Sequence, residues 1–305
     1  MMNRTILIHL STLSSCVLLV LFGIDATCLA QKTLAWKLPK GRILRVQIDQ
    51  TTKMKLDGLP PSKAAMSSNT TQQKTEMSWT VLDVLEDKSA RIEQAVTRIV
   101  FEMQSPGLTF VIDTNDKKPL TGVAATMASS FNSIAGTRFV VSTKPSGEII
   151  EWSVPDETKK KWIEEKGGLS ESGMKELSMN STMQLPEIPI RVGDDWQQKY
   201  ELEMQALGNF SVTTTYQYLG EEVVNGVTLD KIRATTALRS ANVEEKAGIK
   251  LNKQESLGTI WFNNQIGCID HSEFHQDIAM DVLQAGMEIK QVANQDLKIR
   301  FIANP

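Results

Sequence analysis

Apolar and polar residues alternate with a period of two along most of this 305-residue chain. In residues 44–56 one set of alternate positions is largely apolar and the other is polar: Leu44, Val46, Ile48, Gln50, Thr52, Met54 and Leu56 against Arg45, Gln47, Asp49, Thr51, Lys53 and Lys55. Successive side chains of a strand point to opposite faces of its sheet. The pattern therefore predicts a long strand with one buried and one solvated face, which is typical of antiparallel sheets.

The same alternation recurs later in the chain. It is clear at 200–204, 274–282 and 297–301, and further strands are predicted at 76–86, 90–103, 137–143, 148–152, 210–219, 229–240 and 256–262. Residues with turn chemistry separate these segments: Glu86-Asp87-Lys88, Pro145-Ser146-Gly147, Asn225-Gly226 and 263–267. Residues 57–75 are polar and are predicted to form a hairpin loop.

Helical patterns are fewer. Residues 119–134 carry apolar side chains at three- and four-residue spacing, and Gly136 follows them, which predicts a helix that ends there. A second helix is predicted at 153–166, because Ser153 can cap its N-terminus and the proline two residues later suits the first turn. A weaker pattern predicts a third helix at 170–179.

These elements predict a mainly β fold of the α+β class, with long curved antiparallel strands and a few helices on one side. The order of elements in residues 31–184 matches the order in residues 185–305. Each half has a glycine turn before a long strand, then a strand pair, and then a hairpin that turns at a glycine. The match favours a duplicated half-barrel. We therefore predict an N-terminal half with a helical insertion and a C-terminal half, as two domains or one continuous domain.

The N-terminus has the pattern of a cleavable signal peptide, residues 1–30. A short positive region precedes a long apolar run, and the small residues Cys28 and Ala30 precede the predicted cleavage bond before Gln31. An uncleaved membrane anchor is the alternative, since about 20 apolar residues span a bilayer. Neither Cys16 nor Cys28 lies where an acylated lipoprotein cysteine would. The protein is therefore predicted to be exported, to the periplasm or the extracellular space.

Cysteine content and charge narrow the class further. Cys268 is the one cysteine after residue 30, so no internal disulfide can form, and a small buried side chain is the expected role. The formal net charge is −3, with both signs mixed, which gives no reason to expect nucleic acid as a partner. Later apolar runs are short and interrupted by charges, so no membrane span is predicted after the signal peptide.

Residues 185–196, with the sequence LPEIPIRVGDDW, form the most characteristic segment. It resembles the LPxxPVxVGDxW segment of a domain-of-unknown-function family of exported bacterial proteins, common in planctomycete-type genomes, with Ile190 in place of valine. Residues 34–41 and 258–267 also resemble that family. The resemblance implies an exported protein and supplies no activity, cofactor or catalytic residue. At the level of fold, long antiparallel strands with helices on one side resemble the half-barrel of periplasmic lipoprotein carriers.

His271, Glu273 and His275 are the sharpest chemical pattern in the mature chain. Alternate strand residues share a face, so these three could hold zinc if a neighbouring strand closed the site. The simpler interpretation is the wet face of an amphipathic strand. Side chains two residues apart on a strand lie roughly 7 Å apart, so three in a row cannot all reach one ion without a bulge. We therefore predict no metal ligands here.

Other candidate chemistry is sparse. Adjacent acids, interpreted as solvated carboxylates, occur at Asp194-Asp195, Glu221-Glu222 and Glu244-Glu245. Three of the tryptophans are predicted to pack in the core: Trp79, Trp196 and Trp261. The chain has no nucleophile elbow and no phosphate-binding glycine loop. We predict no catalytic, cofactor-binding or metal-binding residue and no cofactor.

The absence of catalytic motifs favours a non-enzymatic protein that binds an apolar or lipid-like ligand in the cell envelope. Long strands with methionine-rich and aromatic apolar faces support this hypothesis. The alternative is a scaffold that recognises an envelope protein through an exposed strand edge. A remote alternative is a metal-dependent hydrolase that uses His271, Glu273 and His275. The sequence names neither a ligand nor an oligomeric state.

Overall fold

The computed structural model describes residues 31–60, 67–157, 182–204, 208–240, 249–284 and 287–303. Residues 31–305 belong to one compact unit. The predicted signal peptide and the helix predicted at 170–179 lie outside the described residues. Of the helix predicted at 153–166, Asp156 and Glu157 are helical and residues from 158 onward lie outside. Its predicted cap was wrong, because Ser153 is the last residue of a strand.

The described residues form twelve strands, and a helix, α1 (Gly122–Ile134), lies between the fourth and the fifth. The strands are β1 (Ile43–Asp57), β2 (Ser68–Val84), β3 (Ala90–Ser105), β4 (Leu108–Asp113), β5 (Arg138–Thr143), β6 (Ile149–Ser153), β7 (Asp195–Met204), β8 (Gly208–Val224), β9 (Val227–Ser240), β10 (Ile249–Asn263), β11 (Cys268–Gln284) and β12 (Met287–Ala303). The mainly β prediction is therefore confirmed.

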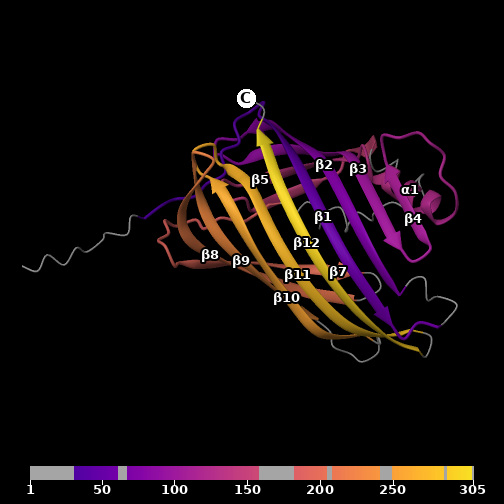
Figure 1. The fold of residues 1–305 in the computed structure, drawn as a ribbon. Helices are drawn as coiled ribbons and strands as arrows, with labels where there is room; N and C mark the ends of the chain where they lie inside the picture. The colour runs from indigo at the N-terminus through magenta and orange to yellow at the C-terminus, as the bar shows by residue number, and fades with distance from the viewer. Residues whose placement is uncertain are drawn as a thin grey trace, which may run out of the picture. The chain divides into compact units, whose positions relative to one another are not determined.

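All strands belong to one antiparallel sheet in the order β6-β5-β3-β2-β1-β12-β11-β10-β9-β8-β7, and β4 pairs with β3 beside this path. The first and last strands of the chain meet in the middle, where Val46 lies opposite Phe301 (Figure 1). The two halves of the sequence thus form one continuous layer. The predicted duplication into half-barrels stays a prediction.

The strand at 68–75 was missed by the sequence pattern, which predicted a loop over 57–75. Residues 68–84 form β2, and its first half pairs with β1 along its length. In most strands one face is apolar. In the first half of β2 the equivalent face carries Asn69, Thr71, Gln73 and Thr75. Polar residues on both faces remove the apolar alternation that reveals a strand, although threonine itself favours extended backbone.

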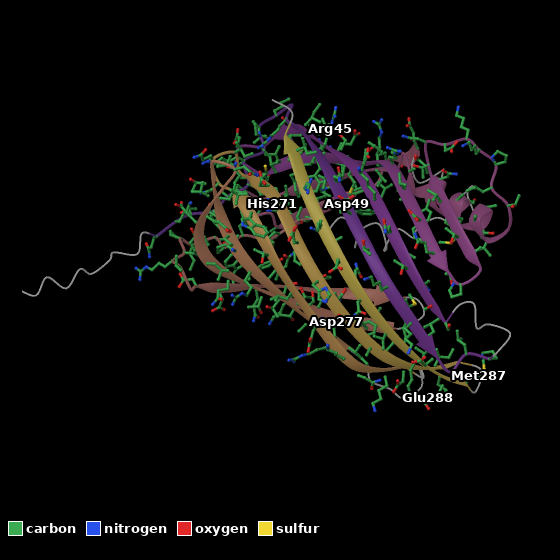
Figure 2. The ribbon with its side chains drawn as sticks, in the orientation of Figure 1. Arg45, Asp49, His271, Asp277, Met287 and Glu288 are labelled. Carbon is green, nitrogen blue, oxygen red and sulfur yellow. The ribbon has the colours of Figure 1, made fainter. Side chains whose placement is uncertain are left out.

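The sheet has two chemically distinct faces. We name the face that carries Leu44, Val46 and Ile48 the inner face, and the face that carries Arg45 and Asp49 the outer face. Along β12 inner positions are half-buried or buried and outer positions are exposed. Charged side chains project from the outer face along the long strands (Figure 2). The predicted division into a buried and a solvated face is confirmed.

The sheet curls around its inner face. In Figure 1 strands β7 and β8 pass behind β10, β11 and β12. Four strands separate β7 from β12 in the sheet, yet residues of both strands line one pocket. Curling of this kind follows from the right-handed twist that accumulates over many strands. It converts the inner face of the C-terminal half into the wall of a cavity.

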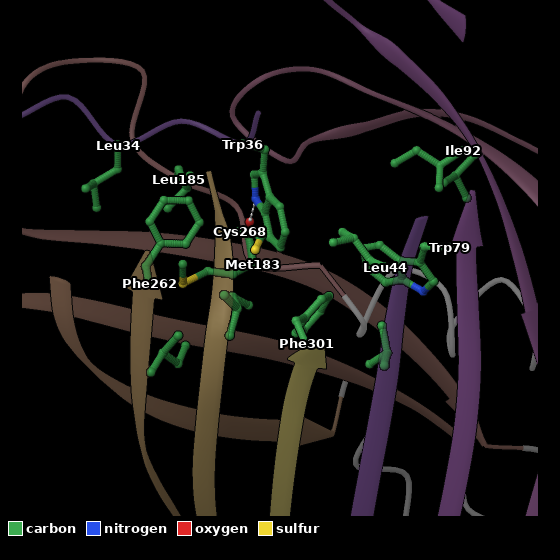
Figure 3. Packing of buried hydrophobic residues seen from close by; sticks show 14 of the residues in the cluster. Leu34, Trp36, Leu44, Trp79, Ile92, Met183, Leu185, Phe262, Cys268 and Phe301 are labelled. Atoms are coloured by element: carbon green, nitrogen blue, oxygen red, sulfur yellow. Dashed lines mark hydrogen bonds between the residues drawn. The ribbon is translucent and has the colours of Figure 1, made fainter. Parts of the chain in front are cut away.

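Aromatic side chains fill one end of the inner face (Figure 3). The Trp36 ring lies 5.7 Å from the Phe262 ring and 6.0 Å from the Phe301 ring, between ring centroids. Trp79 meets Phe301 edge to face at 5.2 Å. Edge-to-face and tilted contacts at these distances are favourable arrangements for aromatic rings. This cluster is the centre of the hydrophobic core.

Two segments outside the sheet, residues 31–38 and residues 182–190, cover the aromatic cluster. We name residues 182–190 the strap. The two segments pair with each other through Lys32 and Ile190, whose backbone N–H and C=O groups are joined at 2.8 and 2.9 Å. The indole N–H of Trp36 donates to the Met183 carbonyl at 3.0 Å (Figure 3). The indole N–H of Trp196 donates to the next carbonyl, Gln184, at 2.8 Å. Two backbone carbonyl groups of the strap therefore accept hydrogen bonds from tryptophan side chains.

Gly147, in the turn between β5 and β6, allows the strap to approach. Its φ of +84° is accessible to glycine at little cost. A Cβ atom there would lie 2.4 Å from the Met183 carbonyl oxygen and 2.6 Å from the Trp36 Nε1. The turn predicted at Pro145-Ser146-Gly147 is therefore confirmed, and glycine is required by its neighbours as well as by its conformation.

The helix α1 packs against the other end of the N-terminal half. Its Phe131 ring lies 5.0 Å from the ring of Phe101 on β3. It begins at Gly122, three residues later than predicted, because Thr121 has extended backbone and makes no side-chain cap. Among the described residues, no helix has the length and apolar character needed to cross a bilayer.

Candidate functional site

The three candidate ligands on β11 do not converge on one point in the structure. His271, Glu273 and His275 lie on the outer face, as their spacing predicts, but each binds a different partner. The Nδ1 of His271 contacts Asp270 at 2.7 Å, and Glu273 accepts a hydrogen bond from Lys298 at 3.0 Å. Within the described residues, no group of three His, Cys, Asp or Glu side chains converges on a point that could hold a metal ion.

His275 is held between two carboxylates. Its Nδ1 lies 2.7 Å from Asp296 and its Nε2 lies 3.2 Å from Asp277. The hydrogen bond to Asp296, aided by the charge of Asp277, raises the His275 pKa above its ordinary value of 6.5. A raised pKa means that this contact stabilises the fold below about pH 6.5 and that the contribution is lost as the pH rises through the folded-state pKa.

We expect the substitution Asp296→Asn to lower the pKa of His275, because it removes the negative partner of the protonated ring. NMR titration of the His275 ring protons measures the shift. Glu273→Gln is the matched control, since it removes one charge from the same face of β11 without touching His275. An equal pKa decrease in both variants would show that the general surface potential, and not the hydrogen bond, sets the value.

Cys268 is a core residue, which confirms the prediction of a buried thiol. It is 1% exposed, and its sulfur lies 3.5 Å from the Arg42 guanidinium. Burial raises the pKa of the Cys268 thiol, and the nearby Arg42 charge only partly offsets this effect. A buried thiol with a raised pKa is a poor nucleophile, so this cysteine serves packing.

The paired acids are dispersed. Glu221 binds Lys32, while Glu222 accepts a hydrogen bond from the Trp261 indole at 2.7 Å. Asp194 caps a turn by accepting from the Arg191 N–H at 2.8 Å, and Glu244-Glu245 lies outside the described residues. The core prediction for Trp261 was wrong: its position opposite His271 places it on the outer face, where the two rings stack at 4.3 Å.

The feature that does form a site is a pocket of about 180 Å³ on the inner face. One wall is apolar and comes from β10, β11 and β12: Ile260, Ile269, Phe274, Leu297, Ile299 and Phe301. The facing wall comes from β7, β8 and β9 and is polar but uncharged: Gln198, Tyr200, Thr214, Tyr216 and Thr236. Ser272 and the strap residues Thr182 and Met183 complete the lining, and none of the described residues that line the pocket is charged.

The polar wall is organised by hydrogen bonds. The Tyr216 hydroxyl donates to the Gln198 Oε1 at 3.0 Å, and the same oxygen accepts from the Gln184 N–H of the strap at 3.2 Å. The Thr214 and Thr236 hydroxyls lie 3.0 Å apart and share one hydrogen bond. Burial raises the pKa of Tyr216 far above its ordinary value, so its hydroxyl stays protonated and neutral.

The apolar wall depends on one glycine. Gly258 on β10 lies directly opposite Phe274 on β11, and a Cβ atom there would lie 2.1 Å from the Phe274 ring. The ring therefore lies over the backbone of Gly258. An aromatic side chain packed over a cross-strand glycine is a recognised way to pin strand register. At this position it also fixes the shape of the apolar wall.

The polar residues of the pocket belong to a longer row on the inner face. Following strand register from β1 to β7, the row consists of Thr52, Gln295, Gln276, Ser256, Thr236, Thr214 and Gln198. We name this row the polar band. The pairing of β9 with β10 ends one residue before it, at Thr235 and Leu257. Every member is uncharged, whereas the outer face of the same strands is rich in charge.

Gln254 bridges β9 and β10 where their pairing ends. Its amide nitrogen donates to the Thr236 carbonyl at 2.8 Å, and its Oε1 accepts from the Leu238 N–H at 3.0 Å. One side chain thus replaces two ladder hydrogen bonds. Because strands without a partner expose backbone donors and acceptors, this bridge holds the polar wall against the apolar wall.

We expect Gln254→Ala to lower the free energy of unfolding by about 1–2 kcal/mol, because two half-buried backbone groups lose their partners. Amide hydrogen exchange at Leu238 should accelerate more than exchange elsewhere in β9. Gln295→Ala is the matched control, a glutamine on the same face whose side chain makes no hydrogen bond to a described residue. Equal exchange rates at Leu238 in both variants would contradict the bridging role.

Sequence reasoning did not identify this pocket. The signal was present in segments such as 211–218, where hydroxyl and amide residues stand at positions that an exposed strand face would fill with charges. Which of these residues meet across a cavity depends on the curl of the sheet, which brings β7 opposite β12.

Comparison with known proteins gives no family. No family model matches the chain, and no curated protein sequence does. The resemblance of residues 185–196 to an exported domain-of-unknown-function family therefore stays a prediction. In the structure Leu185 is buried in the strap, Gly193 forms a turn with φ +97°, and Trp196 packs half-buried at the start of β7.

Three solved structures resemble the chain weakly. A protein described as exported, with a YmcC-like fold, from Bacteroides fragilis has 12% identity and a TM-score of 0.32, covering 86% of this chain and 98% of its own. DynF from the dynemicin biosynthesis pathway of Micromonospora chersina has 7% identity and a TM-score of 0.23, with coverage of 88% and 84%. An outer membrane channel from Pseudomonas putida F1 has 9% identity and a TM-score of 0.24, with coverage of 88% and 98%. At these TM-scores the similarities carry no conclusion about function.

Proposed function

We propose that this protein is an exported, non-enzymatic binding protein that holds an apolar ligand on the inner face of its sheet. The observation that carries the proposal is the pocket between β7–β9 and β10–β12, which has an apolar wall and, in the described part of the chain, no charged lining residue. Small-molecule sites are typically concave and mostly apolar, with a few polar groups that fix orientation. The export signal predicted in residues 1–30 supports an envelope or extracellular location.

The pocket is smaller than the ligand we expect. A cavity of roughly 150 Å³ accommodates benzene, whereas sites for drug-sized ligands span roughly 300–1,000 Å³. A volume of about 180 Å³ therefore admits one part of a longer molecule. Beyond the polar band the inner face becomes apolar again, with half-buried Met54 on β1 and half-buried Ile278 and Met280 on β11. The remainder of the ligand would lie along this surface.

The test compares two tryptophan substitutions on one strand. Leu297→Trp fills the pocket from the inner face of β12, and Val292→Trp, at a position that is 42% exposed on the outer face, is the matched control. The ligand probe is 1-N-phenylnaphthylamine, whose fluorescence rises in an apolar environment. We expect wild type and Val292→Trp to bind it and Leu297→Trp to bind at least about tenfold more weakly. No saturable binding to wild type would overturn the proposal.

A scaffold function is the second candidate, and the edge of the sheet favours it. β7 pairs with β8 on one side, and among the described residues no strand pairs with its other side. An unpaired edge of ten residues is a template for strand addition by a partner peptide. Saturable binding of the probe, lost in Leu297→Trp, would favour the ligand-binding function over this one.

A further inference from the structure

We infer that the ligand is an uncharged amphiphile whose oxygen acceptors bind the polar band, for example a neutral acyl ester and not a fatty acid anion. This inference rests on the proposed function and specifies its ligand class. It follows from three features of the pocket: the absence of charge among its described lining residues, the surplus of hydrogen-bond donors, and the placement of these donors beside the apolar wall.

A charged group would find no counter-ion among the described residues that line the pocket. The buried carboxylate of Asp230, on β9, is already paired with the Lys32 ammonium at 2.7 Å. Neither residue lines the pocket. Transfer of an unpaired carboxylate or ammonium from water into such a site is strongly unfavourable. The lining thus selects against fatty acid anions and against cationic amphiphiles.

The pocket offers donors that its own residues leave unused. Ser272 is 2% exposed and lines the pocket, and its hydroxyl makes no hydrogen bond to any residue that the structure describes. The Gln198 side-chain oxygen accepts two hydrogen bonds, while its amide nitrogen donates none within the described part of the chain. The hydroxyls of Thr214 and Thr236 share one hydrogen bond, which leaves one hydroxyl hydrogen available.

Unused donors beside an apolar wall favour a ligand that carries acceptors. A buried polar group without a partner is unfavourable, so an ester carbonyl or hydroxyl oxygen placed here gains more than an alkyl group would. These donors lie within the same pocket as Phe274, Leu297 and Ile299. One ligand can therefore bury an alkyl segment against the apolar wall while its oxygens meet the polar wall.

The arrangement predicts selectivity among ligands of equal chain length. We would measure displacement of bound 1-N-phenylnaphthylamine from the mature chain by monodecanoyl glycerol, decanoate and decane, near pH 8, where the carboxylic acid is ionised. The expected result is that the neutral ester displaces the probe at a concentration about tenfold or more below that of either competitor. Equal displacement by decanoate or decane would overturn the inference.

Two variants attribute the selectivity to the donors. Ser272→Ala and Gln198→Leu should lose most of the preference for the ester over decane, measured relative to the affinity of each variant for the probe. Gln197→Leu is the matched control, because Gln197 is the exposed neighbour of Gln198 on the outer face of β7. Loss of preference in Gln197→Leu, or full preference in both pocket variants, would contradict the assignment.

The outcomes separate this inference from the proposed function. If the probe does not bind wild type, the binding function itself fails. If the probe binds and is displaced by every competitor in proportion to its hydrophobicity alone, the pocket is apolar-selective and only the ligand class is wrong. Circular dichroism and urea unfolding of each variant confirm that any loss of selectivity occurs in a folded protein.

Discussion

Replacement of Trp36 by alanine is expected to lower the free energy of unfolding by about 3–5 kcal/mol, the range for tryptophan or phenylalanine removed from a core. Trp36 is 5% exposed and contacts three aromatic rings, those of Trp79, Phe262 and Phe301. Its indole N–H also supplies the hydrogen bond of the buried Met183 carbonyl. The substitution leaves a cavity and an unpaired carbonyl together, so the two costs add.

Urea denaturation with a fixed m-value measures this loss as a shift of the midpoint. Trp36→Phe separates the two causes, since it keeps much of the ring packing and removes only the donor. It should cost about 1–3 kcal/mol. Trp261→Ala on the outer face is the matched control, and it should cost clearly less than Trp36→Ala. Equal losses at Trp36 and Trp261 would show that Trp36 is not the centre of the core.

Replacement of Asp230 by alanine is expected to cost about 2–4 kcal/mol. Asp230 is 1% exposed, binds the Lys32 ammonium at 2.7 Å and accepts from the Tyr218 hydroxyl at 2.8 Å. Removing one member of a buried pair costs roughly 3–5 kcal/mol, because it leaves an uncompensated charge. The Lys32 side chain is 27% exposed and also contacts Glu221, so water and that carboxylate soften the loss.

Alkaline pH provides an independent test of the same pair. Burial lowers the Lys32 pKa, but its hydrogen bonds to Asp230 and Glu221 outweigh burial, and the pKa is raised above 10.5. A raised pKa means that the pair stabilises the fold below about pH 10.5 and that this contribution is lost as the pH rises through the folded-state pKa. Wild type should therefore lose more stability above that pH than Asp230→Asn does. Parallel pH profiles would contradict the pairing.

Local sequence chemistry predicted most of the strands. The turn at Asn225-Gly226 joins β8 to β9 with Asn225 at φ +51°, as such a dipeptide favours. The strand boundaries were less predictable. β10 and β11 extend beyond the predicted segments 256–262 and 274–282, because cross-strand pairing continues where the apolar alternation fades. Pairing partners, and not the strand's own residues, decide where such strands end.

The candidate site was much less accessible to sequence reasoning than the strands were. The histidine pattern in β11 is visible in the sequence, and the structure disperses it over separate partners on the outer face. Gln198 and Thr236 belong to no sequence motif. In the chain, 37 residues lie between them. They face one cavity because of sheet curvature.

The sequence by itself determined most of the strands and their two faces, and it predicts an export signal, because each depends on residues close together in the chain. Apolar alternation fixes which side of a strand is buried, and turn residues fix the hairpins. The tertiary structure alone decided that β1 pairs with β12, that the strap covers the aromatic cluster, and that uncharged donors meet an apolar wall. These features depend on twist summed over many strands and on contacts between distant segments, and no local pattern encodes that sum.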